Sequence, residues 1–282
     1  MWSNGRKWLE RALAIAPERP ASRERVEATI DAALLASDQM DTAVAKQLAE
    51  AALAQAQELG EPRSTVRALG ALGFVSWKQK AYLLAWTHCE QALALARVLQ
   101  DKILEANLLH ILGRIAMNQN NLESARSCLE QGLAVYQELD DNLGANIASS
   151  DLGLLAYLQH DFASARRYHE RSLHSFREVG DIAGMEMTLN RLGDVARCEN
   201  DYDEAERCYT ECLAIYRETG DKDEIPSLLH NLGYVASYRG EYFRAIALFG
   251  VFVAKGRKPT LRLSQIAVKA SQLCNLVVDS DN

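Results

Sequence analysis

The sequence has little proline and no excess of basic residues. Only 5 of its 282 residues are proline, and 31 Lys and Arg face 38 Asp and Glu, which gives a net charge of −7. This acidic balance disfavours direct binding of nucleic acid, because phosphate binding needs a basic face. Because β-branched residues are sparse beside Ala, Leu, Glu and Arg, the composition favours helices over strands.

Paired cysteines and long apolar runs are also lacking. The six cysteines form no Cys-x-x-Cys pair, so no zinc or thioredoxin-like site is predicted. Cys208 and Cys212 lie four residues apart on a predicted helix, where we expect small core side chains. Scattered thiols favour a reducing compartment, so we expect a cytoplasmic protein. No apolar run approaches the roughly 20 residues of a membrane span, and neither a signal peptide nor a membrane partner is predicted.

The sequence contains no recognisable catalytic motif. A phosphate-binding G-x-x-x-x-G-K-[ST] loop, a G-x-S-x-G nucleophile turn and an H-E-x-x-H zinc helix are all absent. His169 and His174 are five residues apart, which does not suit a helical metal site, so we expect core or surface roles. Asp201 and Asp203 fall in a predicted turn, where carboxylates cap helices. The sequence therefore predicts no enzyme, no cofactor and no metal site.

A 40-residue internal repeat runs through the chain. Leu-Gly recurs at 72–73, 112–113, 152–153, 192–193 and 232–233, with an alanine 12 residues after each glycine and a large apolar residue three before each alanine. Each repeat predicts two helices, called here helix A, which carries Leu-Gly, and helix B, which carries the alanine. Gly180 and Gly220 are expected to end helices as left-handed C-caps.

The repeat divides the chain into predicted parts. Residues 1–20 are expected to be a half repeat that supplies helix B alone as an N-terminal cap. Six full repeats follow at 21–60, 61–100, 101–140, 141–180, 181–220 and 221–260. Residues 261–282 are expected to form a capping helix and tail, preceded by a solvated basic turn at Lys255–Lys258. Repeat 21–60 has Ala33 and Thr42 at the glycine and aromatic positions, so we expect it to pack loosely.

A glycine inside helix A needs a packing reason, because it costs up to about 1 kcal/mol relative to alanine. We interpret the glycine and the later alanine as the place where helices A and B approach closely. The aromatic that opens helix B is then expected to fill the space beside this contact. Neighbouring helix pairs would stack to bury a core that runs along the array.

The Leu-Gly pair, the later alanine and the large apolar residue between them resemble the tetratricopeptide repeat (TPR). The common repeat has about 34 residues. The longer spacing is similar to variants in LGN-type scaffolds, kinesin light chains and the C-terminal arrays of MalT-like bacterial signalling ATPases. The resemblance implies an all-α fold, a right-handed α–α superhelix of about six and a half helix pairs, with helix A lining the concave face.

The inward positions of helix A form the candidate binding face. They mix Asn, Arg and His, which hydrogen-bond peptide groups and carboxylates, with Tyr and Met, which offer apolar area. The predicted peptide-binding residues are Asn107, His110, Arg114, Met117, Ser150, Leu154, Tyr157, Met187, Asn190, Arg191, Asp194, Arg197, Ser227, His230, Asn231, Tyr234 and Tyr238. Phe74, Trp77 and Lys78 extend this line into repeat 61–100.

These residues predict a non-catalytic interaction module, a scaffold or sensor that binds a peptide or protein segment in its groove. By resemblance alone, we expect the C-terminal part of a bacterial signalling or transcriptional regulator. Two alternatives stay open. The array could sense a small molecule, or it could self-assemble into a homo-oligomer through an open repeat end.

Overall fold

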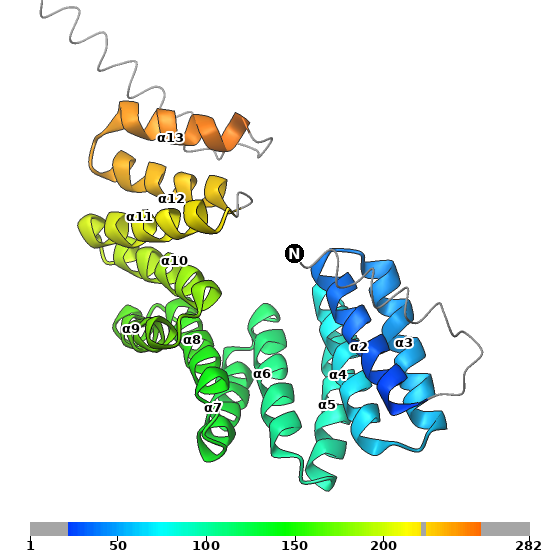
Figure 1. Cartoon of the computed structure of the whole chain (residues 1–282). Coiled ribbons are helices and arrows are strands. Elements are labelled where there is room, and N and C mark those ends of the chain that lie inside the picture. Colours follow the sequence, from blue (N-terminus) through cyan, green and yellow to red (C-terminus); the bar gives the residue numbers. More distant parts are fainter. Residues whose placement is uncertain (1–21, 221–223, 255–282) are drawn as a thin grey trace, which may run out of the picture. The chain divides into compact units, whose positions relative to one another are not determined.

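The computed structural model describes residues 22–220 and 224–254 as an array of helices, labelled as in Figure 1. Twelve helices and no strand occur in these residues: α2 (Arg23–Asp38), α3 (Thr42–Glu58), α4 (Pro62–Lys78), α5 (Tyr82–Val98), α6 (Lys102–Asn118), α7 (Leu122–Glu138), α8 (Asn142–Leu158), α9 (Phe162–Val179), α10 (Ile182–Cys198), α11 (Tyr202–Thr219), α12 (Ile225–Tyr238) and α13 (Tyr242–Ala254). The predicted half repeat at 1–20, the basic turn Lys255–Lys258 and the predicted cap at 261–282 lie outside the described residues.

Helices of two kinds alternate along the chain. The even-numbered helices are the A helices and the odd-numbered ones are the B helices. From α2 to α7 and from α9 to α13 each helix contacts the next, and the A helices α2, α4 and α6 also contact one another in order. The predicted all-α fold of stacked helix pairs is therefore confirmed for the described residues. The chain divides into two compact units, residues 1–155 and 156–282, which are described separately below.

The turns between helices repeat with a period of 20 residues. A residue with left-handed backbone stands in each turn: Met40, Gly60, Lys80, Gln100, Asn120, Asp140, His160, Gly180, Asn200, Gly220 and Gly240. The predicted C-caps Gly180 and Gly220 are confirmed, with φ of 70° and 76°. Asp201 accepts a hydrogen bond from the Glu204 backbone N–H at 3.1 Å, which confirms its predicted capping role. The left-handed backbone of the seven non-glycine residues at this position was not predicted, because a residue other than glycine adopts that conformation at a cost of order 1 kcal/mol.

The mid-helix glycines of the A helices make room for a side chain on helix B. A Cβ atom built on Gly193 would lie 2.4 Å from Cε1 of Tyr209, and one built on Gly113 would lie 2.6 Å from Cγ of Leu129. Gly73 and Gly233 meet Cys89 and Phe249 in the same way. Close approach of helices A and B at the glycine and the alanine was predicted correctly, since a Cβ atom built on Gly73 would also lie 3.3 Å from the backbone oxygen of Ala85. The prediction did not name the side chain that meets the glycine, which belongs to the residue four positions after the helix-B alanine.

In repeat 21–60, smaller side chains form the same contact between the two helices. Ala33 stands at the glycine position, and the facing residue four positions after Ala45 is Ala49. All three are fully buried in one cluster, so alanine packs against alanine at this contact. The expectation of loose packing for the whole repeat stays a prediction. A small residue opposite Ala33 leaves room for its methyl group, whereas a tyrosine or phenylalanine opposite demands glycine.

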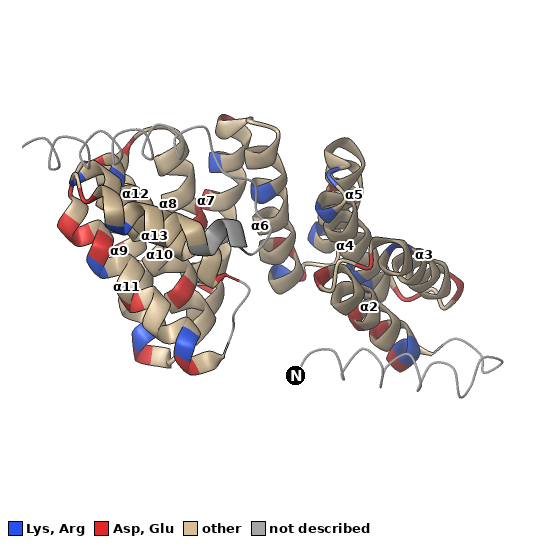
Figure 2. Ribbon diagram, turned by 90° about the horizontal axis from the view of Figure 1, so that it is seen from above, with Lys and Arg blue, Asp and Glu red and all other residues tan. Residues whose placement is uncertain are grey.

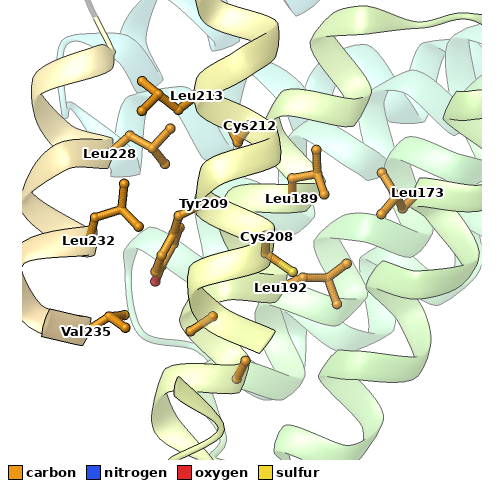
Figure 3. Packing of buried hydrophobic residues seen from close by; sticks show 12 residues of the cluster. Leu173, Leu189, Leu192, Cys208, Tyr209, Cys212, Leu213, Leu228, Leu232 and Val235 are labelled. Carbon is orange, nitrogen blue, oxygen red and sulfur yellow. The ribbon is translucent and has the colours of Figure 1, made fainter. Parts of the chain in front are cut away.

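The core of the second unit shows how the pairs are held together. Figure 3 shows leucines of α9, α10 and α12 converging on α11, where Tyr209 is fully buried. Cys208 and Cys212 are also fully buried there, and burial raises the pKa of both thiols to about 12. The thiols therefore stay protonated at neutral pH and pack as small apolar groups, which confirms their predicted core role.

Candidate binding face of the A helices

Side chains on successive A helices meet in pairs that are 41 residues apart. His110 Nε2 lies 2.8 Å from Asp151 Oδ2, and Asn231 Nδ2 donates to Asn190 Oδ1 at 3.2 Å. In each pair the first residue stands two positions before the leucine of Leu-Gly, and the second stands one position before it. This shared side of the even-numbered helices is called the A-helix face below. Its side chains are held by their neighbours before any ligand arrives, which limits the entropy lost on binding.

In the first unit, the polar part of this face centres on a buried carboxylate. The Asp151 side chain is only 4% exposed, and it lies close to His110 and 3.6 Å from Nε of Arg114. The Arg114 guanidinium lies 4.6 Å from the centre of the Trp77 ring. Asn107 is exposed, and its Oδ1 accepts a hydrogen bond from the Tyr136 hydroxyl at 2.7 Å. These contacts fix a histidine, an arginine and an asparagine in place beside an aromatic ring.

In the second unit, the polar part of the face is built around Asp194. Its Oδ1 accepts from the Tyr209 hydroxyl at 2.7 Å and from Arg197 Nη2 at 3.3 Å. The Arg197 guanidinium in turn lies 6.0 Å from the centre of the Tyr234 ring, within reach of a cation–π contact. Arg197 and Tyr234 remain partly exposed, so both can contact a ligand.

Aromatic contacts also fix the end of this row. The His230 ring lies 4.7 Å from the Tyr234 ring and 5.3 Å from the Phe249 ring, both edge to face. Burial and the nearby Arg197 charge lower the pKa of His230, which favours the neutral imidazole at pH 7. Tyr238, which is 46% exposed, stacks on Tyr202 with ring centres 5.3 Å apart.

Most of the predicted binding residues reach the surface, but two do not. Ser150 is fully buried and Met117 is 8% exposed, so the prediction that they contact a ligand was wrong. A short serine side chain does not reach past its neighbours, and the apolar methionine chain folds toward the core. Asn107 and Tyr238 are exposed, and the remaining residues are half-buried: His110, Arg114, Leu154, Tyr157, Met187, Asn190, Arg191, Asp194, Arg197, Ser227, His230, Asn231 and Tyr234.

The predicted set missed a cavity in the first unit. It has a volume of about 310 Å³ and is lined by Ile30, Leu34 and Asp38 of α2, by Val66, Arg67, Gly70, Ala71 and Phe74 of α4, and by Leu104, Asn107, Leu108 and Ile111 of α6. Of its lining residues, Asn107 belongs to the seventeen predicted residues, and Phe74 was named as an extension of that line. The signal lay in Ile111, which is apolar at the position that holds Asp151, Arg191 and Asn231 in the later repeats, and in the apolar Leu34 and Phe74.

Charged residues gather on B helices in the second unit, and the ribbon colours of Figure 2 mark them along α9 and α11. The segment of α12 contains no Lys, Arg, Asp or Glu. The charges bridge neighbouring helices, since Arg177 contacts Glu211, and both Arg239 and Arg244 contact Glu206. The B-helix surface therefore carries largely compensated charge, while the A-helix face carries hydrogen-bonding and aromatic groups.

The part of the chain that the structure describes lacks both a metal-binding cluster and a membrane-spanning helix. Residues 22–220 and 224–250 contain no cluster of three or more His, Cys, Asp or Glu side chains suited to a metal ion. His169 is buried, and His174 lies on the surface, 3.4 Å from Glu178, as expected of core and surface histidines. Within the same residues, no helix combines the length and apolar character needed to cross a bilayer.

Helix pairs at a 40-residue spacing, stacked through A-helix contacts and repeated turns, define the class of α-helical repeat proteins. The particular repeat is identified by comparison. A family model of the tetratricopeptide repeat matches residues 64–138, 104–178 and 184–250, which together are more than half of the chain. The chain therefore belongs to the tetratricopeptide repeat family. No curated protein matches the full sequence.

Solved structures of low sequence identity share the fold. BtubC (BKLC) from P. vanneervenii is 23% identical, with a TM-score of 0.62 over 78% of this chain and 90% of that one. A Rap protein complexed with competence and sporulation factor is 17% identical, with a TM-score of 0.68 over 95% and 70%. A signal transduction ATPase with a tetratricopeptide repeat sensor, from Pyrococcus horikoshii, is 15% identical with a TM-score of 0.67. This chain is covered to 96% in that match but spans only 41% of the ATPase. At these identities the likeness establishes the fold alone.

Proposed function

We propose that this protein is a non-catalytic interaction module that binds a protein segment along its A-helix face. The observation that carries the proposal is the pairing of polar side chains between successive A helices. Asn190 and Asn231 hold each other in place while both stay partly exposed, and the partly exposed His110 is held by the buried Asp151. Preorganised polar groups beside apolar area are what recognition of a peptide requires.

The residues of the second unit suit the groups of a peptide. Asn190 and Asn231 offer amide donors and acceptors to a peptide backbone. Arg197 offers a guanidinium to a carboxylate, and the Tyr234 ring beside it offers apolar area with a polar tip. We propose that Arg191, Met187 and Ser227 complete this surface.

Neighbours of the same fold support a regulatory role. The Rap protein was solved in complex with competence and sporulation factor, and the signal transduction ATPase from Pyrococcus horikoshii carries a tetratricopeptide repeat sensor. Both favour assigning this chain to signalling or regulation as a cytoplasmic scaffold or sensor, by analogy of fold. As part of the same proposal, this chain is the C-terminal part of a longer bacterial signalling or transcriptional regulator.

Selection from a random peptide library on the full chain tests the proposal. Peptides recovered on the wild type should bind the Asn190→Ala, Asn231→Ala double variant about thirtyfold more weakly, since two peptide hydrogen bonds worth about 1 kcal/mol each are lost. The control is Arg126→Ala, Glu130→Ala, which removes an exposed ion pair from the B helix α7. Circular dichroism checks that both variants stay helical.

The proposal would be contradicted if no peptide were recovered. It would also be contradicted if the Asn190→Ala, Asn231→Ala variant bound the peptides as well as the Arg126→Ala, Glu130→Ala control does.

A cavity of about 310 Å³ also favours a second candidate function, sensing of a small molecule. That function predicts a ligand-dependent rise in melting temperature in the absence of any peptide. Self-assembly predicts instead a mass that grows with protein concentration.

A further inference from the structure

The contact between α4 and α6 lacks the polar pair found elsewhere on the A-helix face. The residues equivalent to His110 and Asp151, or to Asn190 and Asn231, are Gly70 and Ile111. Glycine leaves empty the space that a histidine or asparagine side chain would occupy. Both residues line the cavity of the first unit, so this change of residue type explains why the cavity lies here.

The cavity is apolar, and its charged rim is compensated. Nine of its twelve lining residues are apolar or glycine. On the rim, the Arg67 guanidinium contacts the carboxylates of Glu27 and Asp31, and Asp38 Oδ1 lies 3.6 Å from the Lys78 ammonium. An ionic ligand would meet no unmatched charge, and it would lose its hydration on entering. A neutral apolar group has no charge whose hydration would be lost, and it would bury apolar surface against Leu34, Phe74 and Ile111.

The size of the cavity selects the kind of apolar group. A cavity of about 150 Å³ lined by apolar side chains holds a benzene molecule. At about 310 Å³, this one has room for a leucine, phenylalanine or tryptophan side chain together with the Cβ and backbone that carry it. Smaller groups would leave contacts unmade on one side, and such gaps forfeit dispersion energy.

We propose that this cavity is an anchor subsite for one large, uncharged apolar side chain of the bound protein segment, and that Gly70 determines its specificity. The inference rests on the proposed function for the origin of that side chain. The subsite itself can be tested without a partner. Single capped amino acids serve as probes: the N-acetyl amides of leucine, phenylalanine, tryptophan and lysine.

The first experiment titrates these probes into the full chain with ¹³C-labelled methyl groups and follows the methyl resonances by NMR. The three apolar probes should shift the methyls of Ile30, Leu34 and Ile111 and bind at least about tenfold tighter than the lysine probe, because burying such a side chain favours binding by that order. Equal binding of all four probes would overturn the inference. Shifts confined to methyls outside the cavity, or no shifts at all up to the solubility of the probes, would also overturn it.

Variants then test the role of Gly70. Gly70→His places in this repeat the residue found at the same position in two others, His110 and His230. A Cβ on Gly70 would meet only the flexible end of Leu108, with Cδ2 at 3.2 Å, so the substitution adds volume without striking the backbone. We expect loss of apolar probe binding by at least about tenfold. Leu83→His, at a position that is 78% exposed on α5, is the matched control and should bind as the wild type does.

A second variant tests the cavity in case Gly70→His does not fold. Ile111→Gln replaces a partly exposed apolar side chain by a slightly longer one that ends in an amide, and it should weaken binding of the apolar probes in the same way. Unchanged probe binding in a folded variant of either kind would overturn the inference.

Peptide selection separates this inference from the proposed function. Peptides that bind the wild type should share one large apolar residue, and Gly70→His should abolish that preference. Peptides that bind but tolerate Gly70→His and depend on Asn190 and Asn231 would sustain the proposed function and overturn the subsite. Probe binding at the cavity with no peptide recovered would sustain the cavity as an apolar site and overturn the proposed function.

Discussion

Two contacts between A helices, one in each compact unit, use equivalent positions of the same repeat for different chemistry. In the first unit, Gly70 and Ile111 leave an apolar hollow between A helices. In the second unit, Asn190 and Asn231 close the equivalent place with a hydrogen bond. The backbone repeat is the same in both, with a turn every 20 residues. The comparison teaches that the fold is set by buried positions, whereas the chemistry of the A-helix face is free to vary from one repeat to the next.

The largest expected effect concerns the buried contact that both units share. Gly193→Leu should destabilise the protein by roughly 1–3 kcal/mol, because the added side chain strikes the Tyr209 ring. Urea unfolding measures the loss. Gly193→Ala should destabilise in the same direction, since its methyl alone would lie 2.4 Å from Cε1 of Tyr209.

Gly250 provides the matched control for this prediction. It also lies inside a helix, but a Cβ atom there would meet nothing within 4 Å. Gly250→Ala should therefore be stabilising, by up to about 1 kcal/mol from helix propensity alone. Equal effects of the two alanine substitutions would contradict the packing role of the repeat glycine.

The next prediction concerns replacement of the apolar pair between α4 and α6 by the amide pair found between α10 and α12. Gly70→Asn with Ile111→Asn should create, between α4 and α6, the amide pair seen at Asn190 and Asn231. We expect the apolar probes to bind at least about tenfold more weakly, because polar groups now fill the hollow. The methyl titration measures this change, and retention of wild-type affinity would show that the hollow is not set by this pair of positions.

Hydroxyl groups provide a smaller comparison between the units. The buried Tyr209 hydroxyl donates to Asp194 at 2.7 Å, whereas the Tyr82 hydroxyl donates to exposed Asn118 at 3.4 Å. Tyr209→Phe should cost about 1 kcal/mol, since it leaves the Asp194 carboxylate without that donor. Tyr82→Phe should cost less than about 0.5 kcal/mol. Thermal or urea unfolding of the two variants should show this order, and the reverse order would contradict the account.

The smallest expected effect belongs to the charged surface of the B helices. Arg239 contacts Glu206 and Asp203 from a position that keeps its side chain partly exposed. Arg239→Ala should cost about 0.5 kcal/mol, because exposed ion pairs are weak and screened. The difference from wild type should shrink in about 1 M salt. A cost that did not depend on salt would point to packing of the arginine stem instead.

The sequence was sufficient to predict the helices, because buried positions repeat without slippage. Gly193 and the helix-B alanine are constrained by core packing, so their 40-residue spacing reveals the fold. The facing residue, Tyr209, was missed because its type varies among Cys, Leu, His, Tyr and Phe from repeat to repeat. Variable residues give no periodic signal even where they fill the same space.

The binding face was harder to predict from spacing. Position within a repeat does not say how far a side chain reaches, so Ser150 was placed on the surface although it is buried. Apolar residues at inward positions, such as Leu34 and Ile111, were not singled out, because their spacing does not distinguish them from core residues. Only the arrangement of three helices shows that they surround a cavity instead.

The most direct test is a crystal structure of the full chain with a peptide recovered by selection. The account predicts that the peptide lies on the A-helix face, with one large apolar side chain in the cavity beside Gly70. A peptide bound to the charged surface of the B helices, or one that leaves both the cavity and the Asn190–Asn231 pair untouched, would contradict it.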